Sequence, residues 1–154
     1  MFKRILLLLT AAIVLVGIAA PAPAAEKIKI LLIDGENNHN WKVMRPVTVA
    51  ILESTGMFSV DISQLPSNKD PGEKWDAWKP EFAKYAAVVS NYNDKGTCRW
   101  PAERRKEFEE YIAGGGGFVP IHAADNSSAD WPAYNEMIAV GGWGGRKPKD
   151  GCLL

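Results

Sequence analysis

Both histidines of this 154-residue chain fall in polar segments that directly follow apolar runs. His39 lies in the segment 34–41, and His122 opens the segment 122–126. Imidazole can take up and release a proton near neutral pH, and this makes histidine the commonest general acid or base. We therefore predict that His122 acts as a general acid or base and that His39 helps to bind a substrate. A structural hydrogen bond is the alternative for either residue alone.

Amide and aromatic side chains occur in similar surroundings. Asn91 and Tyr92 follow another apolar run, and several of the six tryptophans stand in polar or glycine-rich segments. Indole faces can cover the apolar faces of sugar rings while amides and guanidinium groups bind hydroxyls. This pattern predicts a saccharide ligand, whereas Trp75 and Trp78 are expected in the core. The predicted substrate-binding residues are His39, Trp41, Asn91, Tyr92, Trp131, Trp143 and Arg146.

Other site chemistries have weaker support. No G-x-S-x-G nucleophile motif is present, and His122 takes the elbow-like position after its strand. Cys98 lies in a loop with no assigned base, so we expect it to be structural or incidental. Imidazole and carboxylate suit Zn or Mn, but no tight ligand spacing occurs. We assign no metal ligand or other cofactor, and a divalent metal at His39 and His122 is left open.

Strands and helices are predicted to alternate along the chain. The apolar run 27–34 predicts a strand buried on both faces of a parallel sheet. Val43, Val47, Ala50 and Ile51 recur at helical spacing and are expected to face that sheet. The pattern as a whole predicts a doubly wound, three-layer α/β fold with an open parallel sheet. Further strands are predicted at 57–62, 86–90 and 118–122, further helices at 101–113 and 131–140, and a surface loop at 64–74.

Ligands of doubly wound sheets bind beyond the carboxyl ends of the strands, where the strand order reverses. The three polar segments, at 34–41, 91–94 and 122–126, all follow predicted strands, so we expect them at one edge of the sheet. The glycines 114–117 follow a helix and precede a strand, which favours helix termination over phosphate binding. For 141–146, a flexible linker and a ligand-contacting loop, in which Trp143 stacks and Arg146 donates hydrogen bonds, both stay open.

The first 24 residues are typical of an export signal. Lys3 and Arg4 precede an apolar run of about 14 residues, which is short of the roughly 20 that span a bilayer. We expect a signal peptide at 1–24, one domain at 25–154, and a periplasmic or secreted protein that does not bind membranes after cleavage.

The net charge is zero, with 18 basic and 18 acidic residues, and gives no sign of nucleic-acid binding. A homo-oligomer and a bridge between Cys98 and Cys152 are left open.

Several motifs together resemble the trehalose-utilisation, or ThuA-like, family. They are His39-Asn40-Trp41, Asn91-Tyr92, the helix leading into 115–117, His122-Ala123-Ala124, and the segments 131–136 and 141–146. The resemblance covers about 27–149 and implies a flavodoxin-like, class I glutamine amidotransferase-like sheet and a role in carbohydrate metabolism. Related amidotransferases use a Cys nucleophile that is missing here, so no glutaminase activity is expected. The family continues past Arg146, and we expect the chain to be incomplete at its C-terminus.

These observations favour an exported enzyme that processes trehalose or a related saccharide at a histidine-based site. Two alternatives stay open. The first is a carbohydrate-binding module that holds a sugar in the same cleft without converting it. The second is a truncated, inactive fragment, because an open sheet that lacks its last strands exposes an apolar edge.

Overall fold

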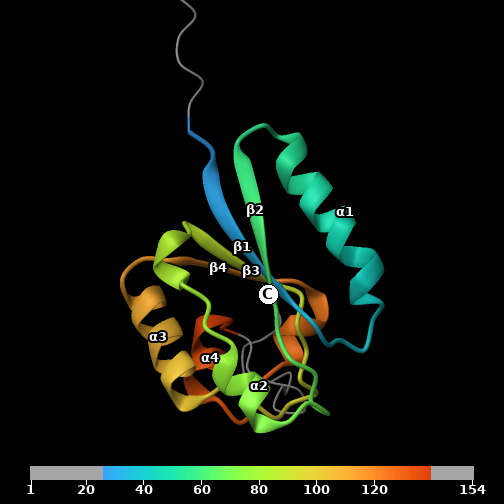
Figure 1. Ribbon diagram of the computed structural model, residues 1–154. Coiled ribbons are helices and arrows are strands. Elements are labelled where there is room, and N and C mark those ends of the chain that lie inside the picture. The colour runs from blue at the N-terminus through green and yellow to red at the C-terminus, as the bar shows by residue number, and fades with distance from the viewer. Residues whose placement is uncertain (1–25, 140–154) are drawn as a thin grey trace, which may run out of the picture.

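The computed structural model describes residues 26–139, which form a four-stranded parallel sheet between two layers of helices (Figure 1). The strand order is β2-β1-β3-β4, the order of a flavodoxin-like open sheet, so the predicted fold class is confirmed. The strands are β1 (Ile28–Asp34), β2 (Phe58–Gln64), β3 (Ala87–Ser90) and β4 (Gly117–Pro120). The helices are α1 (Trp41–Ser54), α2 (Gly72–Ala77), α3 (Ala102–Ala113), α4 (Pro132–Met137) and the 3-10 turns η1 (Phe82–Lys84) and η2 (His122–Asn126).

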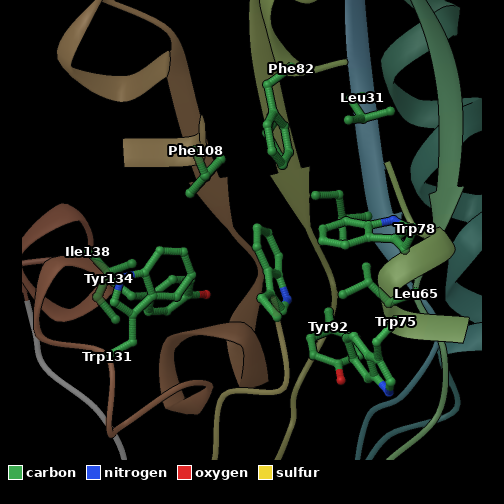
Figure 2. Close-up of a cluster of buried hydrophobic side chains, with 13 residues drawn as sticks. Leu31, Leu65, Trp75, Trp78, Phe82, Tyr92, Phe108, Trp131, Tyr134 and Ile138 are labelled. Carbon is green, nitrogen blue, oxygen red and sulfur yellow. The ribbon is translucent and has the colours of Figure 1, made fainter. Parts of the chain in front are cut away.

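One face of the sheet packs against α2, α3 and α4 through an aromatic core (Figure 2). Phe108 of α3 is fully buried, and its ring lies 5.0 Å from that of Phe82 and 5.5 Å from that of Trp100, measured between centroids. Trp75 and Trp78 are buried in the same core, as predicted. The strands pack on this core, and the core thereby positions the loops at their carboxyl ends.

The opposite face packs against α1 alone among the described helices (Figure 1). Val49 and Leu52 contact Ile30 and Leu32 there. The predicted inward stripe of α1 was wrong: Val43, Val47, Ala50 and Ile51 all point outward and are exposed. The helix carries apolar residues almost all round, so its periodicity fits two faces and cannot decide which one meets the sheet.

The last predicted strand is shorter than expected. β4 lies at the edge of the described sheet and ends at Pro120, so the missing N–H of proline falls at a strand end. His122 therefore belongs to η2 and not to the strand. α3 ends at Ala113 with Gly114 as its C-cap, and Gly115 has a φ of 94°, which confirms that these glycines terminate a helix.

The segment between β2 and β3 was predicted less well. β2 continues two residues past the expected end, to Gln64, and the predicted surface loop 64–74 contains the first turn of α2, which was not predicted. Within residues 26–139, no helix has the length and hydropathy needed to cross a membrane. The expected leader and the residues Trp143, Arg146 and Cys152 lie outside the described residues.

Candidate functional site

Gly35 turns the chain out of β1 and into the first loop of the site. Its φ is 135°, and a Cβ built there would stand 2.3 Å from the carbonyl oxygen of Leu65. The N–H of Leu65 also donates to the carbonyl of Asp34 at 2.7 Å, which keeps the two backbones close. Only glycine fits this close approach. The loop then enters α1 at Asn40, whose side chain accepts a hydrogen bond from the N–H of Val43.

The loops after β1 and β3 are joined by amide side chains at the point where the strand order reverses. Asn37 Nδ2 donates to the carbonyl of Asn91 at 2.9 Å and to its side-chain oxygen at 3.2 Å. Asn93 Nδ2 donates to Asn38 Oδ1 at 3.2 Å, and its N–H donates to the carbonyl of Glu36 at 2.9 Å. These bonds fix the two loops relative to each other where doubly wound sheets bind ligands.

The two histidines lie together at this edge of the sheet. The ring centroids of His39 and His122 are 4.7 Å apart, and their planes are inclined by 36°. Both side chains are exposed to solvent. His122 has a φ of 49°, a left-handed conformation that is uncommon for residues other than glycine and that clusters at functional sites.

A buried network holds the turn that carries His122. The Asp94 carboxylate accepts from the N–H of Ser128 at 2.7 Å, from its hydroxyl at 2.6 Å and from the N–H of Gly96 at 2.9 Å. Tyr134 donates its hydroxyl hydrogen to the carbonyl of Ala124 at 2.8 Å. Because these groups are buried, their hydrogen bonds rigidify the loops after β3 and β4.

Asp34, at the end of β1, forms an ion pair with Arg45 of α1. Its carboxylate is fully buried and accepts from Arg45 Nε at 2.7 Å, while Arg45 Nη2 donates both to the carboxylate and to Gln64 Oε1. The hydrogen bond to Asp34 raises the pKa of Arg45, and partial burial of the guanidinium opposes that rise. The guanidinium also lies 4.9 Å from the ring centroid of Trp41, so it positions the indole. We did not predict Arg45, although its position four residues after Trp41 on the helix could have indicated the contact.

Several hollows open at the carboxyl edge of the described sheet. A hollow of about 200 Å³ is lined by Asn38, Asn93, Lys95 and Asn126. Asn38 precedes His39 in the chain, and Asn126 ends the turn that begins at His122. A larger one of about 670 Å³ lies on the other side of the β1 loop, and Trp41 forms part of its wall. A hollow of about 730 Å³ lies between η1 and α3, at the amino ends of β3 and β4. Ligands of this fold class bind at the carboxyl ends, so we favour the first two.

The comparisons with known proteins agree with this architecture. No family model and no curated protein matches the chain. It is similar to the solved structure of a ThuA-like protein from Parabacteroides merdae, with a TM-score of 0.69 and 43% identity over 79% of this chain and 41% of that one. The chain belongs to the ThuA-like family.

A ThuA-like protein from Bacteroides uniformis aligns with a TM-score of 0.45 and 23% identity, over 76% of this chain and 46% of that one. A likeness of that size carries no conclusion. This ThuA-like chain spans 41% of the length of the Parabacteroides merdae protein.

The ThuA-like chain brings together some of the predicted site residues and separates others. His39 and His122 lie together at the carboxyl edge, and Trp41 lies in the wall of the neighbouring hollow. Asn91 is buried at the same edge, where its carbonyl and side-chain oxygens accept hydrogen bonds from Asn37. The remaining two described residues of the predicted set, Tyr92 and Trp131, lie in the aromatic core (Figure 2).

Their burial separates both rings from solvent. Trp131 Nε1 donates to Glu109 Oε1 at 2.7 Å. Burial raises the pKa of Tyr92, and its hydroxyl has no hydrogen-bond partner among the described residues. These two rings pack in the core next to the loops of the site and thereby support them. Tyr92 directly follows Asn91 in the chain, so its anchoring also holds that residue in place.

Cys98 of the ThuA-like chain is expected to react slowly with alkylating reagents. Burial raises the pKa of its thiol from 9.0 to about 11, and only the thiolate is nucleophilic. At pH 8 this shift leaves roughly 100-fold less thiolate than in an unfolded chain. The rate with iodoacetamide, measured on a Cys152→Ser variant, should rise about tenfold per pH unit up to that pKa. Equal rates for folded and urea-unfolded chains at pH 8 would contradict this expectation.

Proposed function

We propose that this ThuA-like chain binds trehalose or a related saccharide at the carboxyl edge of its sheet and processes it with His122 as general acid or base. One observation carries the proposal: two imidazoles from the loops after β1 and β4 lie 4.7 Å apart at the point where ligands of this fold bind. The chain spans 41% of its Parabacteroides merdae relative, and the activity proposed here is for the part of the site that this chain contributes.

His122 is the better candidate for proton transfer of the two histidines. Its left-handed backbone is held by the loop that Asp94 and Ser128 secure, while its side chain is exposed to solvent. A strained but fixed backbone with an accessible imidazole supports a group that must stay in one position during a reaction. His39 stands beside it on a loop that asparagine side chains hold, which favours substrate positioning.

The polar lining of the smaller hollow favours a hydroxyl-rich ligand. The smaller hollow is lined by three asparagines and one lysine, and amide groups both donate and accept hydrogen bonds. Sugar hydroxyls need both kinds of partner. Trp41, in the neighbouring hollow, adds an apolar ring of the kind that covers sugar C–H faces.

A divalent metal between the histidines has less support than proton transfer. Within residues 26–139, no group of three or more His, Cys, Asp or Glu side chains could hold a metal ion. Glu36, the nearest carboxylate in sequence to His39, accepts a hydrogen bond from the N–H of Asn68 and pairs with Lys95, and Asp34 is held by Arg45. Two imidazoles alone give fewer than the three protein ligands of a usual zinc site.

We further propose that the protein is exported, on the basis of the apolar, positively charged first 24 residues. The second candidate function is a carbohydrate-binding module that does not convert its ligand. The solvent exposure of both imidazoles favours it, because general acids and bases are often shielded from water when they act.

A titration followed by NMR tests the proposal. The chain has two histidines, so their imidazole C–H resonances report directly on the site. Trehalose and a panel of disaccharides should shift both resonances saturably, and a His39→Asn variant assigns each signal. Product formation in the same samples supports the enzyme, and saturable shifts without product support the module. If no saccharide moves either resonance, the proposal is wrong. Shifts with Zn²⁺ that EDTA reverses would favour the metal site.

A further inference from the structure

The larger hollow at the carboxyl edge, of about 670 Å³, differs from the smaller one in its charge. Its charged lining residues are Lys42, Arg45, Lys69, Lys95, Glu36 and Asp70. Cations therefore outnumber carboxylates there, although the chain as a whole has no net charge. The smaller hollow is lined by asparagines and a single lysine. A concave surface lined by an excess of one charge attracts ligands of the opposite charge.

Ion pairs within the chain already balance part of this lining. The buried carboxylate of Asp34 neutralises Arg45. Lys74, which lies outside the hollow, pairs with Asp70 at 2.7 Å, and the N–H of Ser67 donates to the same carboxylate at 2.8 Å. These groups shape the wall of the hollow but leave little charge for a ligand.

Two lysines of the larger hollow have no counter-ion. Neither Lys42 nor Lys69 forms an ion pair within residues 26–139, and both side chains are exposed. Lys42 Nζ lies 5.5 Å from the ring centroid of Trp41, which is in the same wall. The hollow therefore combines an aromatic ring with two positive charges that nothing in the described part of the chain balances.

Lys95 connects the two hollows, because its side chain lines both of them. Its backbone is left-handed, with a φ of 63°, and its N–H donates to Asn93 Oδ1 at 2.7 Å, which holds the turn. Lys95 Nζ lies 3.6 Å from Glu36 Oε1, which is too far for a hydrogen bond. The ammonium group can therefore donate to a ligand that extends from one hollow into the other.

We propose that the saccharide bound at this site is anionic, and that its phosphate or carboxylate group binds in the larger hollow to Lys42, Lys69 and Lys95. The inference rests on the proposed function and names its substrate class. The asparagines of the smaller hollow bind the hydroxyls, and lysine ammonium groups bind the anion as point charges. A phosphate monoester carries a charge of about −1.5 to −2 at pH 7, which matches two unbalanced lysines better than a carboxylate does.

Calorimetric titration of the whole chain with glucose, glucuronate and glucose 6-phosphate tests the inference, because the three sugars differ only at carbon 6. Glucose 6-phosphate should bind at least tenfold more tightly than glucose, with glucuronate between them, and added NaCl should reduce the difference by screening. Equal affinities, or no binding of either charged sugar, overturn the inference but not the proposed function, which the titration with uncharged disaccharides decides separately. Inorganic phosphate that binds as tightly as glucose 6-phosphate also overturns it, since the site would then hold a free anion.

Charge removal tests which residues bind the anion. Lys42→Gln combined with Lys69→Gln should lower the affinity for glucose 6-phosphate about tenfold, the combined effect of two exposed ion pairs, and leave that for glucose unchanged. Lys27→Gln is the matched control, because Lys27 is exposed but directly precedes β1, at the opposite edge of the sheet. The indole N–H resonance of Trp41, assigned with Trp41→Phe, should shift on binding. A folded double variant that binds as the wild type does, or an equal loss in Lys27→Gln, overturns the proposal.

Discussion

His122→Asn should lower turnover of a saccharide substrate by about 10²–10⁴-fold while leaving its binding largely unchanged, because this is the usual contribution of a positioned general acid or base. Asparagine is the informative replacement. It tolerates the left-handed backbone that His122 adopts, with φ at 49°, but cannot transfer a proton. The measurement is kcat and KM for the substrate that the titration identifies, together with the urea unfolding midpoint.

The neighbouring histidine supplies the matched control for this prediction. His39→Asn removes an imidazole that lies 4.7 Å from the first, but we assign it to substrate positioning. We expect a higher KM with a smaller change in kcat. If His122→Asn keeps full turnover, proton transfer belongs to another residue. If both variants lose kcat equally, the two rings act as one unit.

Arg45→Met should lower the free energy of unfolding by about 2–4 kcal/mol. The substitution keeps most of the aliphatic stem but leaves the fully buried Asp34 carboxylate without its cation. Removing one member of a fully buried pair costs about 3–5 kcal/mol. The Arg45 side chain is 26% exposed, so we place the expected value somewhat lower. Urea unfolding followed by tryptophan fluorescence measures the change.

A surface ion pair provides the comparison. Lys84 and Glu81 also form a close pair, but both side chains are mostly exposed, and Lys84→Met should change stability by less than about 0.5 kcal/mol. A loss of similar size in both variants would show that burial of Asp34 is not the cause. Arg45→Met should also change the tryptophan emission of the folded chain, because the guanidinium no longer covers Trp41.

The strands and helices could be predicted from the sequence where the local pattern of apolar and charged residues had a single interpretation. The continuous apolar run before Asp34 predicted a strand buried on both faces, and residues 30–34 are indeed buried. α3 was predicted at 101–113 and spans Ala102–Ala113; it buries Phe108, while Glu103, Lys106 and Glu110 mark an exposed, charged side. α1 has no such charged side. Its orientation depends on the contact of Arg45 with Asp34. That contact is a tertiary interaction, so the spacing of residues within the helix could not predict it.

The site was predicted in outline, and its details came from the structure. That polar segments follow parallel strands was enough to expect His39 and His122 at one edge, and the structure brings them together. The chain neighbours of a polar residue, however, do not reveal its burial. Tyr92 and Trp131 stand beside polar residues in sequence, yet they point into the core. The hydrogen bonds between the loops, such as Asn37 to Asn91, join residues 54 positions apart and leave no local signal.

The two imidazoles belong to the loops after β1 and β4, and these strands are not neighbours, because β3 lies between them. The histidine pair therefore exists only when three strands from across the chain have assembled in register. A small molecule held by both rings would bind the native state and not a partly assembled one. Such a ligand would stabilise the folded chain, and the melting temperature should rise roughly with the logarithm of the ligand concentration.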